Sequence, residues 1–373
     1  MSTRARQLRQ SKRWLATLLG TIRAWWSLLL IGCVVFAGCK TAAPATSASA
    51  PPQAAPAAPG APPPAALSAP AATNQPSAAP TPPAPLHVTV AIPATSLSQF
   101  PLALGKQAGI YEQRGINLTN TSMATNTAIA GAISGSVDYA TPAGSLIRAI
   151  ATGAPLRIVV TMTDRSTHLL LINPAAVPDD AALTGKRIAI NSPADNTDLE
   201  AQAALQHFGL DKKDYSAAVI PDDAPKLAAL QAGAIDAAVV SIPFNFRGEA
   251  LGFKTLLNFV QVYEQPTAVL ATTLDRIASQ PAAIQRMVDA TLAATEFTRT
   301  HKAEATRLIG EVYSLEPAEA DAAYELVKES WSATGVLSET AYRNATEPLD
   351  LNPPPPMDAV VDDKFVSAAR QAQ

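Results

Sequence analysis

Cysteine is almost absent from this 373-residue sequence: Cys33 and Cys39 are the only two. The chain after residue 39 therefore cannot contain a disulfide framework, a thiolate metal site or a cysteine nucleophile. Charged residues are also scarce, at 16% of the chain against roughly a quarter in typical domains. Residues 1–39 carry six basic side chains and no acidic one, which leaves 22 basic and 31 acidic residues in the rest. This acidic balance argues against a nucleic-acid-binding protein, whose affinity depends on a basic surface.

Sequence motifs of common enzymes are missing as well. The chain contains no G-x-S-x-G, H-E-x-x-H, P-loop or G-x-G-x-x-G motif. Its four histidines fall in separate predicted elements, and a lone histidine such as His168 is more often structural than catalytic. These absences predict a protein that is not an enzyme and that has no catalytic residue, no metal and no cofactor.

The N-terminus has the composition of an export signal. Residues 1–23 are basic and residues 24–38 are uncharged and apolar, which is the order of a secretory signal. The apolar stretch is shorter than the roughly 20 residues that a membrane-spanning helix requires.

A cysteine ends this apolar stretch in a pattern that resembles the bacterial lipobox. The run is Phe36-Ala37-Gly38-Cys39, and Leu30-Ile31-Gly32-Cys33 fits the same pattern with the better-matched leucine. Cleavage at Cys33 would leave an apolar run at the new N-terminus, which favours Cys39. We expect residues 1–38 to be a lipoprotein signal peptide and Cys39 (alternatively Cys33) to be lipidated. An uncleaved membrane anchor is the competing interpretation.

Residues 39–85 are rich in alanine and proline. Residues 40–86 hold 14 of the 32 prolines and a single charged residue, Lys40. Such a segment has too few large apolar side chains to offset the entropy of ordering. We expect a disordered tether, which at about 3.1 Å per residue would span up to about 140 Å. A low-complexity insert without a role is compatible with the same composition.

From residue 86 onward, predicted strands and helices alternate. Apolar and β-branched runs predict strands at residues 87–92, 116–122, 137–140, 157–162, 168–173, 187–191, 216–220 and 237–241. Helical spacing predicts helices at residues 99–109, 127–134, 144–152, 197–208 and 224–232. This alternation indicates an α/β fold with largely parallel sheets. Residues 281–346 change to helical periodicity, which predicts a C-terminal helical segment.

A short internal repeat links residues 130–140 with residues 227–237. Each copy has a helical run, a glycine (Gly135 or Gly233) and then an aspartate between hydrophobic residues (Asp138 or Asp236). The glycine suits the left-handed position that ends a helix, and the aspartate suits the backbone donors of a turn. The two copies, 98 residues apart, predict two lobes of related α/β construction.

Six segments in order resemble the solute-binding proteins of ABC transporters of the sulfonate, nitrate and thiamine-precursor type, the NMT1/THI5-like and SsuA-like group. They lie at residues 100–116 (FPLALGKQAGIYEQRGI), 135–140, 153–159 (GAPLRIV), 183–189 (LTGKRIA), 227–237 and 361–366 (VDDKFV). The resemblance covers residues 86–373. It implies a two-lobe, type II-like periplasmic-binding-protein fold, in which α/β lobes joined by two crossings bind a ligand between them.

The resemblance also implies domain boundaries. We expect crossings near residues 163–167 and 263–267. Residues 86–164 would then begin lobe 1, residues 165–264 would form lobe 2, and residues 265–373 would return to lobe 1 with the C-terminal helices.

Candidate ligand-binding residues follow from the edge of each predicted sheet. Ligands of open α/β sheets bind beyond the carboxyl ends of the strands, near helix N-termini. This rule selects five polar segments at residues 93–100, 124–127, 141–145, 192–198 and 241–246, whose hydroxyls and backbone N–H groups suit polar or anionic atoms. The predicted ligand-binding residues are Thr95, Ser96, Gln99, Phe100, Thr125, Asn126, Thr127, Thr141, Ser145, Arg165, Ser192, Asp195, Asn196, Ser241, Phe244 and Asn245.

Each candidate has a structural alternative. Small polar residues at these places also suit helix caps, and Phe100 and Phe244 suit core packing as well as stacking on a ring. Arg165 suits a ligand carboxylate, sulfonate or phosphate, but equally a neighbouring acid such as Asp164. Asp195 suits a cationic amine or, more simply, a helix N-terminus.

The sequence therefore predicts the extracytoplasmic, lipid-anchored solute-binding component of an ABC importer. Its expected partners are a small organic solute of sulfonate, pyrimidine/thiamine-precursor or aromatic type and a membrane permease, and we expect a monomer. The lack of an Arg/Lys cluster in the five segments favours a neutral or singly charged solute. The alternatives are an enzyme acting on a thiamine-like precursor in the same fold, and a ligand sensor or structural lipoprotein.

Overall fold

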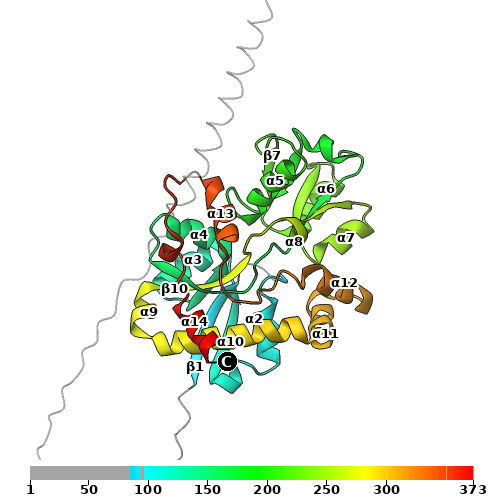
Figure 1. Cartoon of the computed structure of the whole chain (residues 1–373). Helices are drawn as coiled ribbons and strands as arrows, with labels where there is room; N and C mark the ends of the chain where they lie inside the picture. The colour runs from blue at the N-terminus through cyan, green and yellow to red at the C-terminus, as the bar shows by residue number, and fades with distance from the viewer. Residues whose placement is uncertain (1–84, 93–95, 350, 373) are drawn as a thin grey trace, which may run out of the picture. The chain divides into compact units, whose positions relative to one another are not determined.

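The structure is a computed structural model that describes residues 85–92, 96–349 and 351–372, apart from the side chains of residues 180 and 181. The predicted signal peptide, the tether, both cysteines and Thr95 lie outside these ranges. Ten strands in the described ranges form two five-stranded sheets (Figure 1).

The first sheet has the strand order β2-β1-β3-β10-β4. β1 pairs in parallel with β2 and β3, whereas β10 runs antiparallel to β3 and β4. The strands are β1 (Leu86–Ile92), β2 (Ile116–Ser122), β3 (Tyr139–Pro142), β4 (Leu156–Thr161) and β10 (Ala268–Thr273). One apolar cluster against this sheet includes α2 (Phe100–Gln107), α10 (Pro281–Thr300) and α14 (Lys364–Gln371). A second includes α3 (Thr125–Ser134), α4 (Ala143–Ala151) and α13 (Glu339–Thr346).

The second sheet repeats this arrangement with the order β7-β6-β8-β5-β9. β6 is parallel to β7 and β8, and β5 is antiparallel to β8 and β9. The strands are β5 (His168–Ile172), β6 (Arg187–Ile190), β7 (Ser216–Val219), β8 (Ala237–Ser241) and β9 (Lys254–Asn258). One apolar cluster joins this sheet to α5 (Asn196–His207). Another joins it to α6 (Asp223–Gln231), α7 (Phe244–Ala250), α11 (Lys302–Tyr313) and α12 (Pro317–Val327).

Short elements connect these layers. They are η1 (Glu112–Arg114), η2 (Asp180–Leu183), α8 (Phe259–Val262), α9 (Leu274–Ser279), η3 (Glu347–Leu349) and η4 (Met357–Ala359). None of the helices in the described ranges has both the length and the apolar character needed to cross a membrane.

The internal repeat has the same geometry in both sheets. The Asp138 carboxylate accepts the backbone N–H of Thr89 at 2.7 Å, and the Asp236 carboxylate accepts that of Arg187 at 2.9 Å. Gly135 and Gly233 precede these aspartates with φ of 78° and 65°, the left-handed region that favours glycine. The two lobes of related construction predicted from the repeat are confirmed.

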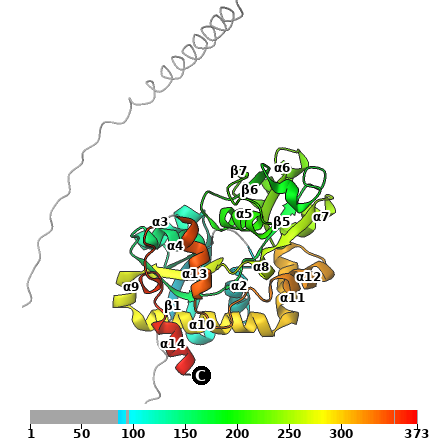
Figure 2. The same cartoon turned by 45° about the horizontal axis from the view of Figure 1, so that its top comes forward.

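Two chain segments join the lobes, and a third runs beside them. The chain passes from β4 to β5 between residues 161 and 168 and returns from α8 to β10 between residues 262 and 268. The Thr163 hydroxyl oxygen accepts the backbone N–H of Thr267 at 3.0 Å. Ser332 donates its backbone N–H to the Met162 carbonyl, which ties the segment after α12 to the first crossing. Figure 2 shows β5–β7 with α5–α7 grouped apart from α3, α4, α9, α10 and α14.

The sheets are mixed rather than largely parallel, which corrects the sequence prediction. Two of the four strand pairings in each sheet are antiparallel. The predicted strands 116–122 and 237–241 coincide with β2 and β8, whereas β9 and β10 were not predicted. Residues 268–272 of β10 are fully or almost fully buried between two neighbouring strands, so they lack the alternation that marks a half-buried strand.

Candidate functional site

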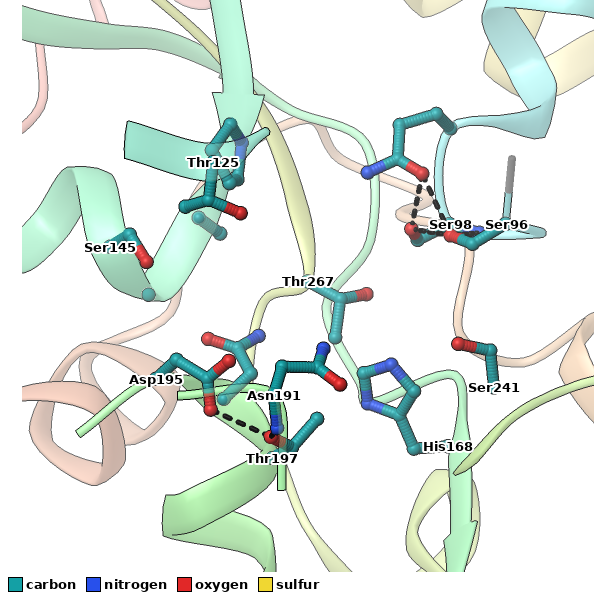
Figure 3. A pocket seen from close by; sticks show the side chains of 15 residues that line it. Ser96, Ser98, Thr125, Ser145, His168, Asn191, Asp195, Thr197, Ser241 and Thr267 are labelled. Carbon is teal, nitrogen blue, oxygen red and sulfur yellow. Dashed lines mark hydrogen bonds between the residues drawn. The ribbon is translucent and has the colours of Figure 1, made fainter. Parts of the chain in front are cut away.

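A polar cavity of about 100 Å³ lies between the two lobes, where several strands reach their carboxyl ends (Figure 3). The first lobe contributes Ser96, Ser98, Gln99, Thr125, Pro142, Ala143, Gly144 and Ser145. The second lobe contributes His168, Asn191, Asp195, Asn196, Thr197 and Ser241, and the second crossing contributes Thr267. No lysine or arginine is among these lining residues.

Three helices of the first lobe begin at the cavity. The N-cap residues of α2, α3 and α4 are Gln99, Ala124 and Pro142, and none of them makes a side-chain capping hydrogen bond. Backbone N–H groups in the first turns of α3 and α4 therefore remain available to a ligand. In α2, Pro101 has no N–H, and the N–H groups of Phe100 and Leu102 donate to the carbonyls of Leu97 and Gln99. The hydroxyls of Ser96 and Ser98 both donate to the Gln99 Oε1, at 2.7 Å and 2.8 Å. The lobe 1 wall thus combines helix N-termini with a fixed group of hydroxyls and an amide.

The N-terminus of α5 faces the cavity from the second lobe, but a side chain caps it. Asp195 Oδ1 accepts the Asp198 backbone N–H at 3.1 Å and the Thr197 hydroxyl at 2.7 Å. Burial raises the pKa of Asp195, and these two hydrogen bonds offset only part of the increase. The contacts of this carboxylate are those of a helix cap.

His168 is held against a buried carboxylate. Its Nδ1 lies 2.8 Å from Oε2 and 3.1 Å from Oε1 of Glu200, whose side chain is fully buried. In Figure 3 the far side of the His168 ring points into the cavity, toward Thr267. Burial lowers the pKa of His168, but the charge and hydrogen bond of Glu200, together with Asp223, outweigh it and leave the pKa raised. The imidazole therefore becomes positively charged more readily than an ordinary histidine.

A buried lysine supports two other cavity residues. The fully buried Nζ of Lys226 donates to Asn191 Oδ1 at 2.6 Å, to the Val239 carbonyl at 2.6 Å and to Asp223 Oδ1 at 3.1 Å. Asp223 in turn accepts the backbone N–H of Ser241 at 3.1 Å. A buried ion pair thus holds Asn191 and the end of β8 in place.

The lobes touch at the rim of the cavity. Asn196, at the start of α5, donates its Nδ2 to the Pro266 carbonyl at 2.8 Å. Its Oδ1 lies against Gly144 in the first turn of α4, where a Cβ would come within 1.9 Å. Arg148 of α4 also reaches the Pro193 carbonyl at 3.5 Å. A side chain at position 144 would have to displace the Asn196 side chain of the opposite lobe.

Comparison with known proteins assigns this architecture to a family. The profile of the NMT1-like family matches residues 81–313, more than half of the chain. The chain belongs to the NMT1-like family. The comparison with curated protein sequences found no match.

Solved structures share the fold of this NMT1-like chain. The ligand-binding component of an ABC-type import system from Staphylococcus aureus is 15% identical, with a TM-score of 0.62 over 76% of this chain and 99% of that one. The alkanesulfonate-binding protein SsuA of Xanthomonas axonopodis pv. citri, bound to MOPS, is 20% identical, with a TM-score of 0.57 over 78% and 98%. The desulfurization enzyme DszB is 15% identical, with a TM-score of 0.57 over 77% and 99%. The two-lobe periplasmic-binding-protein fold with a helical C-terminal segment is confirmed.

The structure places seven of the sixteen predicted ligand-binding residues in the cavity wall of the NMT1-like fold. They are Ser96, Gln99, Thr125, Ser145, Asp195, Asn196 and Ser241. Each of the five predicted segments contributes at least one lining residue. Four predicted residues do not line the cavity: Asn126, Thr127, Ser192 and Phe244. Thr95 lies outside the described residues.

Four further candidates lie outside the cavity wall, three of them with a contact elsewhere in the chain. Phe100 is buried and stacks on Trp331 with ring centroids 6.1 Å apart. The buried Thr141 hydroxyl donates to the Ala91 carbonyl at 3.0 Å, and Arg165 reaches the Val260 carbonyl at 3.4 Å. Asn245 is buried within α7. Phe100 and Asn245 therefore belong to the interior, and Thr141 and Arg165 bond to backbone carbonyls of other segments.

Several lining residues were missed by the sequence prediction. Ser98 and Thr197 belong to the selected segments, and Asn191 directly precedes one of them, so a broader choice would have included all three. His168 gave a weaker signal, since its partner Glu200 lies 32 residues away in no recognisable motif. The residues that the structure describes contain no group of three His, Cys, Asp or Glu side chains that could hold a metal ion.

Proposed function

We propose that this chain is the extracytoplasmic solute-binding component of an ABC importer. It binds one small solute between its lobes, which close on the solute and present it to a membrane permease. The chain acts as a monomer and is not an enzyme.

The observation that carries this proposal is the shared cavity. Its wall comes from helix N-termini of lobe 1, from the strand and helix ends of lobe 2 and from the second crossing. A solute seated there contacts both lobes at once, so its binding energy favours the closed arrangement over the open one. The family match and the importer and sulfonate-binding proteins of the same fold support the same role.

The lining residues favour a solute with one hydrogen-bond-accepting head group. Uncapped helix N-termini and an imidazole with a raised pKa suit an acceptor with at most one negative charge. The described lining residues include no lysine or arginine, which makes the cavity less suited to a multiply charged anion. We propose an organic sulfonate or carboxylate first, and a pyrimidine of the thiamine-precursor type second.

The location of the protein is part of the same proposal. We infer that residues 1–38 are removed and that lipid on Cys39 (alternatively Cys33) anchors residues 39–85 as a tether at the outer face of a membrane. The basic and apolar order of residues 1–38 and the cysteine that follows support this placement.

One observation favours a second candidate, an enzyme. An imidazole whose Nδ1 bonds to a buried carboxylate is an arrangement used in general acid–base catalysis. DszB shows that this fold also occurs in an enzyme. A ligand sensor is the third candidate, and it requires binding without a permease.

The test is thermal unfolding of the full chain with ethanesulfonate, benzoate, nitrate or a hydroxymethylpyrimidine. A solute at 100 times its Kd should stabilise the protein by about 2.7 kcal/mol. Thr125→Trp, which adds a large ring at a lining position, should abolish the shift, whereas Asn126→Trp at the next, non-lining position should retain it. Mass spectrometry of the recovered solute separates binding from turnover. A chemically altered solute would establish the enzyme, and no shift with any solute would remove the support for transport.

A further inference from the structure

We propose that Glu200 is a positioning residue that holds His168 as a hydrogen-bond donor toward the solute. The role toward a solute rests on the proposed function, whereas the contact between Glu200 and His168 is present without solute. Glu200 is fully buried and is not among the residues that line the cavity. It therefore acts on the solute only through His168.

The carboxylate of Glu200 sets the direction of its hydrogen bond with His168. An ionised carboxylate can only accept, and both oxygens of Glu200 lie within 3.1 Å of Nδ1. The Nδ1 of His168 must then carry the hydrogen. The other ring nitrogen, Nε2, is left for the cavity: it accepts a hydrogen bond when the ring is neutral and donates one when the ring is charged.

Charged side chains surround the His168 ring. The ionisable groups that act on it are Glu200 of α5 and Asp223 and Lys226 of α6. Asp223 is paired with Lys226, so Glu200 is the acid whose direct partner is the imidazole. Burial works against the imidazolium, and the carboxylate of Glu200 is the largest influence that favours it. Loss of Glu200 would therefore shift the ring toward its neutral form.

A neighbouring lining residue, Asn191, is held in the same way. Lys226 donates to Asn191 Oδ1 at 2.6 Å, which fixes the orientation of this amide and leaves its Nδ2 hydrogens as donors. Two lining residues of lobe 2 are thus held as donors by buried charges of opposite sign. Solute affinity through this wall should accordingly fall as the pH rises through the pKa of His168.

The test is nitrogen-15 NMR of the histidine side chains in the full chain, without added solute. The His168→Gln variant identifies the signal among the four histidines. We expect His168 to titrate above the ordinary pKa of about 6.5 and to keep its proton on Nδ1 when neutral. Glu200→Gln, a near-isosteric change, should lower this pKa below 6.5. Glu304→Gln, the same change at an exposed position of α11, should leave it unaltered.

Two results would overturn the proposal: a neutral His168 that carries its proton on Nε2, or a pKa that Glu200→Gln leaves unchanged. If Glu200→Gln does not fold, the tautomer and pKa of His168 in the unmodified chain still test the proposal. The NMR titration is carried out without solute. If the thermal-unfolding test finds no solute, the proposed function is refuted, but the NMR result for Glu200 and His168 still holds.

Discussion

The Oδ1 of Asn196 occupies the space that a side chain at Gly144 would need. A Cβ on Gly144 would lie 1.9 Å from this oxygen and 3.1 Å from the Asn196 Cγ. Gly144 belongs to α4 of lobe 1 and Asn196 to α5 of lobe 2, so this contact measures how closely the lobes approach at the cavity.

Gly144→Ala should keep the lobes from reaching this approach. Alanine in a helix normally stabilises by about 0.5–1 kcal/mol relative to glycine, but here the methyl group must displace Asn196 and its bond to Pro266. We expect solute affinity to fall tenfold or more, about 1.4 kcal/mol, as measured by calorimetry with a solute identified by thermal unfolding. Gly310→Ala is the matched control, since its Cβ would meet only ordinary contacts at 3.4 Å and beyond. Equal affinity in both variants would show that binding does not require this contact.

Lys226→Met should destabilise the second lobe. The change leaves Asp223 and the Val239 carbonyl without the ammonium that now pairs with them. Breaking one side of a buried ion pair costs about 3–5 kcal/mol, which urea unfolding can measure. The double variant Lys226→Met/Asp223→Asn should recover part of this loss. No recovery would mean that Asp223 is not the source of the penalty.

Ionisation of Asp164 should lower the stability of the protein as the pH rises. Its Oδ1 is buried without a hydrogen-bond partner among the described residues, and burial raises the pKa of Asp164 to about 6. Because the folded pKa exceeds the unfolded value near 3.8, the stabilising effect of the protonated form is complete below pH 3.8 and is lost as the pH rises through about 6.

Asp164→Asn should remove this pH dependence. At about 1.4 kcal/mol per pKa unit, the variant should be more stable than the unmodified chain by about 2–3 kcal/mol at pH 7, and the difference should shrink toward pH 4. Urea unfolding at several pH values measures it, with the exposed Asp358→Asn as control. A constant difference across this pH range would assign the effect to something other than ionisation.

Cys39→Ser should abolish lipid attachment. In a bacterial host we expect the unmodified chain in the membrane fraction and the variant released, with mass spectrometry reporting the mature N-terminus. Cys33→Ser should behave like the unmodified chain. The reverse pattern would make Cys33 the lipidation site, and membrane retention of both variants would favour an uncleaved anchor.

Local rules account for the parts of the site that the sequence predicted. Ser145 and Ser241 follow from strand ends and helix starts, and these are visible as Gly, Ser and Thr between apolar runs. The repeat around Asp138 and Asp236 likewise has a local cause, a turn that each carboxylate closes.

The missed features depend on contacts between distant residues. His168 acquires its environment from Glu200, and Asn191 from Lys226, 35 residues away. The central strand β10 lies between β3 and β4, more than 100 residues earlier in the chain. No periodicity within a short window can report such neighbours.

The position of β10 also sets the order in which the protein can be completed during synthesis. The strands of the second sheet are contiguous in the sequence, from β5 to β9, whereas β4 has no neighbour in the first sheet until β10 has been made. The ribosome therefore releases every strand of lobe 2 before lobe 1 can close. Strands β1, β2 and β3 pair with one another and need no later strand, whereas β4 waits for a partner that is made more than 100 residues later.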